Sequence, residues 1–75
     1  MEPILLDLKG LKCPMPALLA RRALARARAG DVFEIVCDDP LAPVDVPHMC
    51  HQEGFEVLAM ERNALVTRLL LRRPV

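Results

Sequence analysis

Residues 10–31 read GLKCPMPALLARRALARARAGD, and this stretch decides the fold predicted for the chain. Its alanine- and arginine-rich part, residues 14–28, is long enough for about four turns of α-helix. At 100° per residue, the small and apolar side chains fall on one face of that helix and the arginines on the other. The apolar face comprises Ala17, Leu19, Ala20, Ala23, Leu24 and Ala27, and the basic face Arg21, Arg22, Arg26 and Arg28. Gly30 is expected to end the helix.

A cysteine stands directly before the two prolines that open this helix. Proline has a fixed φ and no N–H, and neither property harms the first helical turn, where N–H groups lack intrahelical partners. Pro14 and Pro16 are therefore expected at the first and third helical positions, which places Cys13 at the N-cap. A thiolate there would lie near the N–H groups of Met15 and Ala17, with Lys12 adjacent, and such settings lower the pKa of a cysteine. The alternative is that Cys13 is only a small hydrophobic residue at a helix start.

The overall composition limits the class of protein. A length of 75 residues favours a single domain over 1–75, and an apolar fraction of 53% can supply its core without disulfides or metal. Ten basic residues balance ten acidic ones, so no net charge selects for nucleic acid or an anionic membrane. No apolar run approaches the ~18 residues of a membrane span, and the first ten residues lack a signal-peptide layout. We therefore expect a cytoplasmic protein.

Four further segments have strand patterns. They are residues 4–8, 31–37, 55–62 and 65–72, which are short and apolar or β-branched. In the second of these, Phe33, Ile35 and Cys37 share one side and Glu34 lies on the other. The last two segments are separated by a tight turn around residues 62–64, which predicts an antiparallel hairpin.

A second helix is predicted over residues 40–53, closed by Gly54. Pro47 falls in its interior, where proline removes a hydrogen bond, so we expect a break or a fresh start near Val46. The element order is then β-α-β-α-β-β. This order predicts an α+β protein with one four-stranded sheet and both helices on one face.

The run LDLKGLKCPMPALLARRAL, residues 6–24, resembles the amino-terminal signature of the TusA (SirA-like) sulfur-carrier family. The shared elements are a strand carrying an aspartate, then Gly10, Leu11 and the basic Lys12, followed by the C-P-x-P motif of residues 13–16. The resemblance continues through DDP at 38–40, DVPHMC at 45–50, GFEVL at 54–58 and TRLLLRR at 67–73. It covers nearly the whole chain, and C-P-x-P in this context is a specific signal.

The resemblance implies a two-layer βαβαββ sandwich with a mixed sheet, and a sulfurtransferase acting as a protein persulfide carrier. Cys13 would accept sulfur as a persulfide from a cysteine desulfurase or a rhodanese-like protein, and pass it to an acceptor protein such as a DsrE-like one. Destinations known in the family are tRNA thiolation, molybdenum-cofactor assembly and sulfur oxidation. We expect a monomer that needs no cofactor. Cys37 departs from the pattern, since the family would favour a residue like alanine there.

The other two cysteines have mainly structural interpretations. The three cysteines are odd in number and none forms a C-x-x-C pair, which indicates free thiols in a reducing compartment. Cys37 is expected to be a buried, inert thiol, and packing is also favoured for Cys50. A metal site with His48 and His51 is not predicted, because Cys50 would point away from their shared face.

Two other functions remain open from the sequence. One is a non-catalytic regulatory or binding module in which Cys13 only caps the helix. The other is a thiol redox protein in which Cys50 resolves a bond to Cys13.

The basic face of the first helix is interpreted as a docking surface for an acidic protein partner. Lys12, Arg21 and Arg22 could flank the thiol and steer such a partner to it. Direct RNA binding is disfavoured, because Phe33 and Phe55 are the only aromatic residues and both have core patterns. Asp38, Asp39 and Asp45 are expected to be caps and turn formers, and Arg68 to lie on the open sheet face without a predicted partner.

Overall fold

The computed structural model describes residues 2–75, so residue 1 of the predicted 1–75 domain lies outside the described residues. In chain order its elements are β1 (Ile4–Asp7), α1 (Met15–Arg26), β2 (Val32–Cys37), α2 (Ala42–Glu53), β3 (Glu56–Asn63) and β4 (Val66–Arg72). The predicted order of strands and helices is confirmed. In the part of the chain described, no helix has both the length and the apolar character that crossing a membrane requires.

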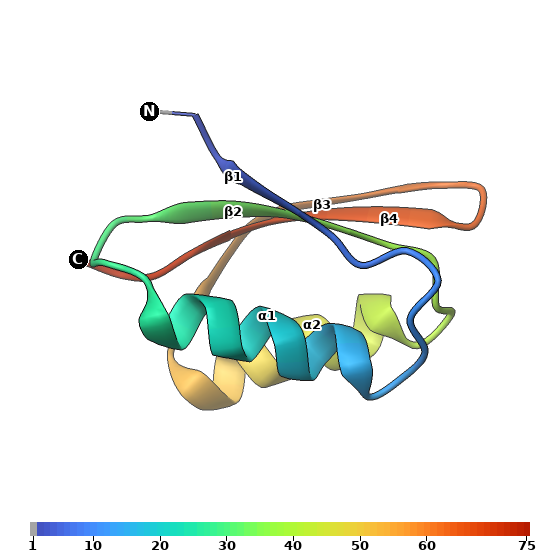
Figure 1. The fold of residues 1–75 in the computed structure, drawn as a ribbon, viewed down its shortest axis with the longest axis horizontal. Coiled ribbons are helices and arrows are strands. Elements are labelled where there is room, and N and C mark those ends of the chain that lie inside the picture. The colour runs from blue at the N-terminus through green and yellow to red at the C-terminus, as the bar shows by residue number, and fades with distance from the viewer. Residues whose placement is uncertain (1) are drawn as a thin grey trace.

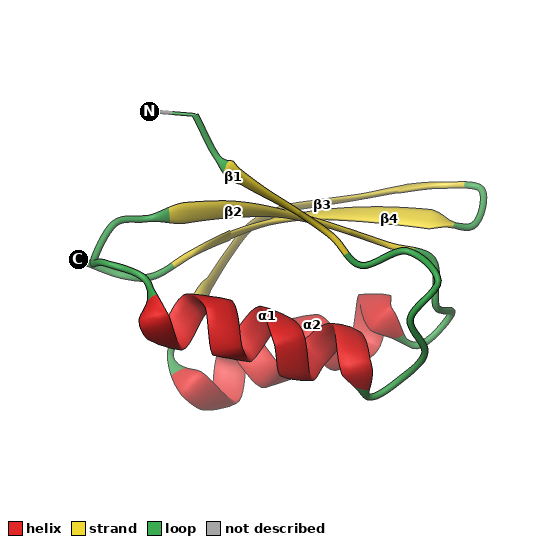
Figure 2. Ribbon diagram, viewed as in Figure 1, coloured by secondary structure: helices red, strands yellow, loops and turns green. Residues whose placement is uncertain are grey.

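The four strands form one mixed sheet in the order β1-β2-β4-β3. β1 runs parallel to β2, whereas β4 pairs antiparallel with both β2 and β3. A parallel pair needs a long crossover, and α1 supplies it between β1 and β2. Both helices cover the same face of the sheet, which gives two layers (Figures 1 and 2). The predicted α+β sandwich is therefore confirmed.

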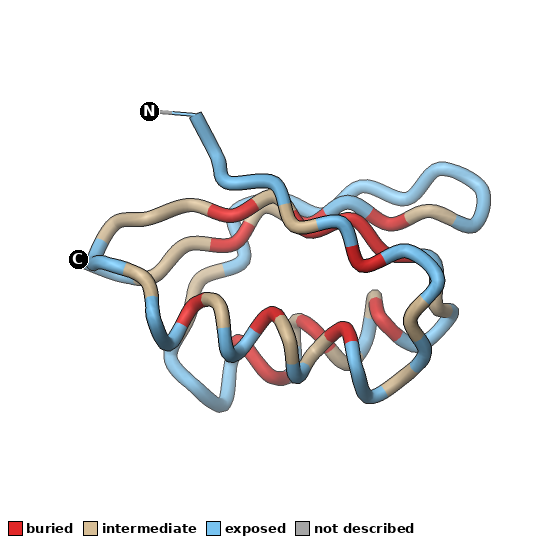
Figure 3. The backbone as a smooth tube through the Cα atoms, viewed as in Figure 1, coloured by how far each residue is buried: buried red, intermediate tan, exposed pale blue. Residues whose placement is uncertain are grey.

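The core lies between the sheet and the helices, where the buried segments of both layers face each other (Figure 3). Phe33, Ile35 and Cys37 of β2 point into it, as their alternation predicts. The remaining contributions come from α1 (Ala20, Leu24), α2 (Ala42, Val46, Met49, Cys50), β4 (Leu69, Leu71) and Leu8, which follows β1. The arginines of α1 are exposed on its opposite face, so the predicted division of that helix is confirmed.

α1 ends at Arg26, two residues before the predicted end, and Gly30 lies beyond it in the following turn with a φ of 90°. This helix end has a contact from the other end of the chain. The guanidinium of Arg73 donates hydrogen bonds to the carbonyls of Leu24 at 3.0 Å and Ala25 at 2.7 Å. The carbonyl of Leu24 also accepts from the amide of Ala27 at 3.2 Å, so a distant arginine adds to the local backbone cap.

α2 is continuous from Ala42 to Glu53, so the predicted break near Val46 is wrong. Pro47 does lie inside the helix, and an interior proline costs about 3 kcal/mol. Val46 and Met49 are buried on the core side, however, and full burial of such a side chain contributes about 1.5–3 kcal/mol each. Packing therefore holds the helix together through the proline. Gly54 closes it in the left-handed region with a φ of 79°, as predicted.

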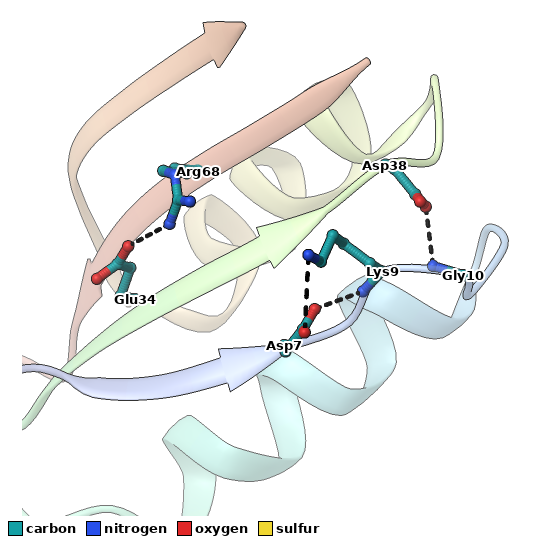
Figure 4. Close-up of polar contacts among 6 residues, drawn as sticks. All are labelled: Asp7, Lys9, Gly10, Glu34, Asp38 and Arg68. Carbon is teal, nitrogen blue, oxygen red and sulfur yellow. Dashed lines mark hydrogen bonds and ion pairs between the residues drawn. The ribbon is translucent and has the colours of Figure 1, made fainter. Parts of the chain in front are cut away.

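The face of the sheet away from the helices carries ion pairs between neighbouring strands. Arg68 Nη1 lies 2.8 Å from Glu34 Oε2 (Figure 4), so Arg68 has a partner that the sequence alone does not identify. Arg72 Nε lies 2.7 Å from Glu56 Oε1, and its hydrogen bond lowers the pKa of Glu56. Both pairs are cross-strand contacts, which become visible only once the strand order is known.

Candidate functional site

Cys13 lies in the connection between β1 and α1, half-buried and one residue before the N-cap of the helix. The N-cap is Pro14, which makes no side-chain capping bond, and the amides of the first turn begin with Met15. Pro16 is buried within that turn. The predicted N-cap position of Cys13 is therefore wrong by one residue.

The connection is tied down by hydrogen bonds at its start. The amide of Lys9 donates to Asp7 Oδ1 at 3.0 Å, and the amide of Gly10 donates to Asp38 Oδ1 at 2.9 Å (Figure 4). Gly10 has a φ of 85°, a conformation that glycine adopts without strain. Leu11 then packs against the core. These contacts place the thiol at the edge of the helix layer.

The thiol has a carboxylate partner from the second helix. Cys13 Sγ donates a hydrogen bond to Asp45 Oδ2 at 2.6 Å, across 32 positions of sequence. Asp45 lies in the first turn of α2 and is half-buried. It was predicted only as a cap or turn former, so sequence reasoning missed its contact with the thiol.

A topological signal could have suggested this contact. β1 and β2 are parallel neighbours, so the connections that follow them leave the same edge of the sheet. Cys13 follows β1 and Asp45 follows β2. The pairing of these two strands therefore brings the two residues together.

The carboxylates beside the thiol raise its pKa, whereas the sequence predicted that it would be lowered. The hydrogen bond to Asp45 raises the pKa of Cys13, and partial burial and the negative charges of Asp45 and Asp39 raise it further. The prediction of a pKa lowered by the helix end and Lys12 is therefore wrong. The physical reason is proximity, since Asp45 touches the sulfur, whereas Cys13 lies outside the N-cap.

Cys37 and Cys50 are both fully buried. Burial raises the pKa of Cys37, whose Sγ lies 3.8 Å from the carbonyl oxygen of Thr67. Burial also raises the pKa of Cys50 to about 11. The predicted packing role is confirmed for both cysteines. A resolving role for Cys50 is disfavoured, because its thiol lies in the core and is protonated at neutral pH.

The residues of the possible metal site point in different directions. Cys50 faces the core, whereas His48 and His51 are exposed. Within residues 2–75, no three His, Cys, Asp or Glu side chains are arranged to hold a metal ion.

The surface around the thiol is hollowed and partly basic. An open groove of about 320 Å³ lies between α1 and α2, and its lining includes Pro14, Leu18, Arg21 and Asp45. A second hollow of about 520 Å³ lies along α1, where Arg21 and Arg22 both line it. Met15 and Leu18 are 41% and 43% exposed beside these arginines. Lys12 is also exposed, so the residues predicted for partner docking are all accessible.

The fold and the site together define a class of small βαβαββ proteins with an accessible cysteine just before the first helix. The chain matches the family described as Sulfurtransferase TusA over residues 4–73, and it belongs to that family. Its structure is similar to the crystal structure of a SirA-like protein from Desulfitobacterium hafniense. The TM-score is 0.80 at 25% sequence identity, and the match covers 96% of this chain and 99% of that chain.

Family membership confirms the resemblance seen in the sequence. It gives the chain a sulfur-carrier or sulfurtransferase role, with partners in sulfur relay.

Proposed function

We propose that Cys13 is the residue that carries the sulfur, as a persulfide on its Sγ. The observation that supports this proposal is the contrast among the three thiols. Cys13 is half-buried beside an open groove, whereas Cys37 and Cys50 are each 0% exposed. A carrier must meet the sulfur of its donor and then that of its acceptor, so its thiol has to be reachable by two proteins in turn.

The reaction is an exchange of one sulfur atom between two cysteines. Cys13 Sγ attacks the terminal sulfur of a donor persulfide, and the donor sulfur–sulfur bond breaks with its electron pair going to the donor cysteine. An acceptor cysteine then attacks the terminal sulfur on Cys13 in the same way. Each step exchanges one sulfur–sulfur bond for another, so it needs no external oxidant, reductant or cofactor.

The donor in this proposal is a cysteine desulfurase or a rhodanese-like protein, and the acceptor is a cysteine of another protein, such as a DsrE-like one. The sulfur feeds tRNA thiolation, molybdenum-cofactor assembly or sulfur oxidation, and the chain acts in the cytoplasm as a monomer. Lys12, Arg21 and Arg22 form the docking face for these partners, supported by two basic helix residues lining the hollows beside the thiol. Pro14, Met15 and Pro16 support the thiol by shaping the helix entry.

The test is to incubate the chain with a cysteine desulfurase and cysteine and to measure its intact mass. We expect a gain of one sulfur atom that a thiol reductant removes, and peptide mapping should place it on Cys13. The Cys13→Ser variant should gain none, whereas Cys37→Ala should gain it as the wild type does.

The same measurement separates the rival functions. A non-catalytic module would gain no sulfur from any donor. A redox protein would instead lose two hydrogens on mild oxidation, through a bond between Cys13 and Cys50. Either result would overturn the carrier assignment of Cys13.

A further inference from the structure

We propose that Asp45 is a second catalytic residue, which takes the proton of Cys13 when Sγ attacks a donor persulfide and returns a proton when Sγ leaves. This inference rests on the proposed function of Cys13 as the carrier. It assigns the proton transfers of both steps to one carboxylate on α2.

The contact geometry supports this role directly. The S–H of Cys13 points at Asp45 Oδ2, and the two heavy atoms are 2.6 Å apart, so a proton moves between them without a mediating group. Asp45 is held in the first turn of α2, where its amide donates to the carbonyl of Leu41 at 2.8 Å. The neighbouring Val46 is fully buried, which anchors this turn against the core.

Among the described residues, the Asp45 carboxylate forms no ion pair with a basic side chain. Within residues 2–75, no Lys, Arg or His nitrogen lies within 4.0 Å of its oxygens. The charged groups that act on the thiol are Asp45 on α2 and Asp39 before it, and Lys12 precedes the thiol in the chain. The adjoining groove also carries Arg21, His48 and Glu53. Asp45 and Asp39 both raise the pKa of Cys13.

Because its pKa is raised, the Cys13 thiol must lose a proton during the reaction. The resting sulfur is a neutral thiol at neutral pH, and the thiolate is the nucleophile in persulfide exchange. A proton must therefore leave Sγ as the new bond forms. Asp45 Oδ2 is the acceptor already hydrogen-bonded to that proton.

The loading step balances with Asp45 in this role. Sγ forms a bond to the terminal sulfur of the donor, which keeps its own proton, and the donor sulfur–sulfur bond breaks. Its electron pair goes to the donor cysteine, which leaves as a thiolate. The proton passes from Sγ to Oδ2 and then to that thiolate, so the products are a Cys13 persulfide and a donor thiol.

The unloading step uses the same groups in reverse. An acceptor cysteine attacks the terminal sulfur, and the bond from that sulfur to Cys13 Sγ breaks. The proton of the acceptor thiol reaches Sγ through Oδ2, so Sγ leaves as a thiol and not as a thiolate. Asp45 ends each cycle as the carboxylate it was at the start.

Asp45→Asn separates proton transfer from simple electrostatics. The variant keeps the side-chain shape but removes the charge and the base, so the pKa of Cys13 falls and alkylation by iodoacetamide at neutral pH becomes faster. Loading from glutathione persulfide, a donor too small to need the docking face, should instead slow by about 10²-fold. Faster alkylation of Cys13 with slower loading is the expected signature. Continued protection of the buried Cys37 and Cys50 from the same reagent shows that the variant is folded.

Asp39→Asn is the matched control. It removes another negative charge that raises the pKa of Cys13, but this side chain has no hydrogen bond to the thiol, and asparagine can still accept from the amide of Leu41. We expect slightly faster alkylation and loading at or above the wild-type rate. Asp45→Glu, which keeps a carboxylate, should recover part of the loading rate.

The outcomes distinguish failure of this inference from failure of the proposed function. If Asp45→Asn loads faster in proportion to its alkylation, or loads at the wild-type rate, Asp45 has no part in proton transfer and Cys13 remains the carrier. If the wild type gains no sulfur on Cys13 from either donor, the carrier assignment itself fails.

Discussion

The backbone amide of Gly10 donates a hydrogen bond of 2.9 Å to Asp38 Oδ1 and so joins the connection that carries Cys13 to the residue following β2 (Figure 4). Asp38→Ala removes the acceptor and should lower the free energy of unfolding by about 1 kcal/mol. Urea denaturation measures this change. Asp38→Asn retains an acceptor oxygen and should cost clearly less. Equal losses in the two variants would show that the charge, and not the hydrogen bond, holds the connection.

The three thiols should differ in accessibility to a small alkylating reagent. We expect iodoacetamide to label Cys13 in the folded protein and to reach Cys37 and Cys50 only after denaturation, because both are fully buried. The pKa of Cys13 is raised, so its rate at neutral pH should be below that of an unstructured cysteine peptide. Peptide mass spectrometry over a time course measures each rate. Labelling of all three thiols at one rate would contradict the described burial.

Stability should fall at alkaline pH because of Cys50. Burial raises the pKa of this thiol from 9.0 to about 11, so above pH 9 the unfolded chain loses the proton first. The unfolded state then binds fewer protons than the folded one, and stability decreases as pH rises from 9 to 11. A difference of two pKa units corresponds to about 3 kcal/mol.

Denaturation of Cys50→Ala over the same pH range isolates this effect. The variant should be less stable at neutral pH because it leaves a small cavity, but its stability should fall less steeply above pH 9. All other groups are the same in both proteins, so their contributions cancel in the comparison. Parallel curves for the two proteins would show that Cys50 does not contribute.

Charge reversal at Arg21 and Arg22 should slow sulfur transfer from a protein donor. Charges at the rim of an interface act mainly on association rate, and salt screens them over a Debye length of ~8 Å at physiological ionic strength. Arg21→Glu with Arg22→Glu should therefore reduce the rate at low salt, whereas added salt should slow the wild type toward the variant. Alkylation of Cys13 should change little.

Arg26→Glu with Arg28→Glu makes the same change in net charge near the far end of the same basic face, and it should affect transfer much less. Equal slowing by the two double variants would indicate a general charge effect and not a local docking face. A wild-type rate insensitive to salt would instead direct attention to Met15 and Leu18, the exposed apolar side chains beside the thiol.

Local sequence patterns were sufficient to predict most of the helices and strands. The period of the first helix separates its buried and exposed faces, because a helical residue faces the same way every 3.6 positions. Gly54 closes α2 as predicted, since glycine adopts the left-handed conformation there without strain. Local rules failed at the end of α1, where Arg73 adds to the backbone cap, and at Pro47 inside α2.

The sequence by itself determined the order of elements, the two-sided helices, the family and the cysteine that its C-P-x-P motif singles out. These properties depend on neighbours along the chain. Only the tertiary structure decided the strand order, the partner of Arg68 and the state of the thiol. The reason is that Asp45, 32 positions away, reaches Cys13 only through the parallel pairing of β1 and β2, and a carboxylate in contact with the sulfur outweighs the helix end that the sequence suggested.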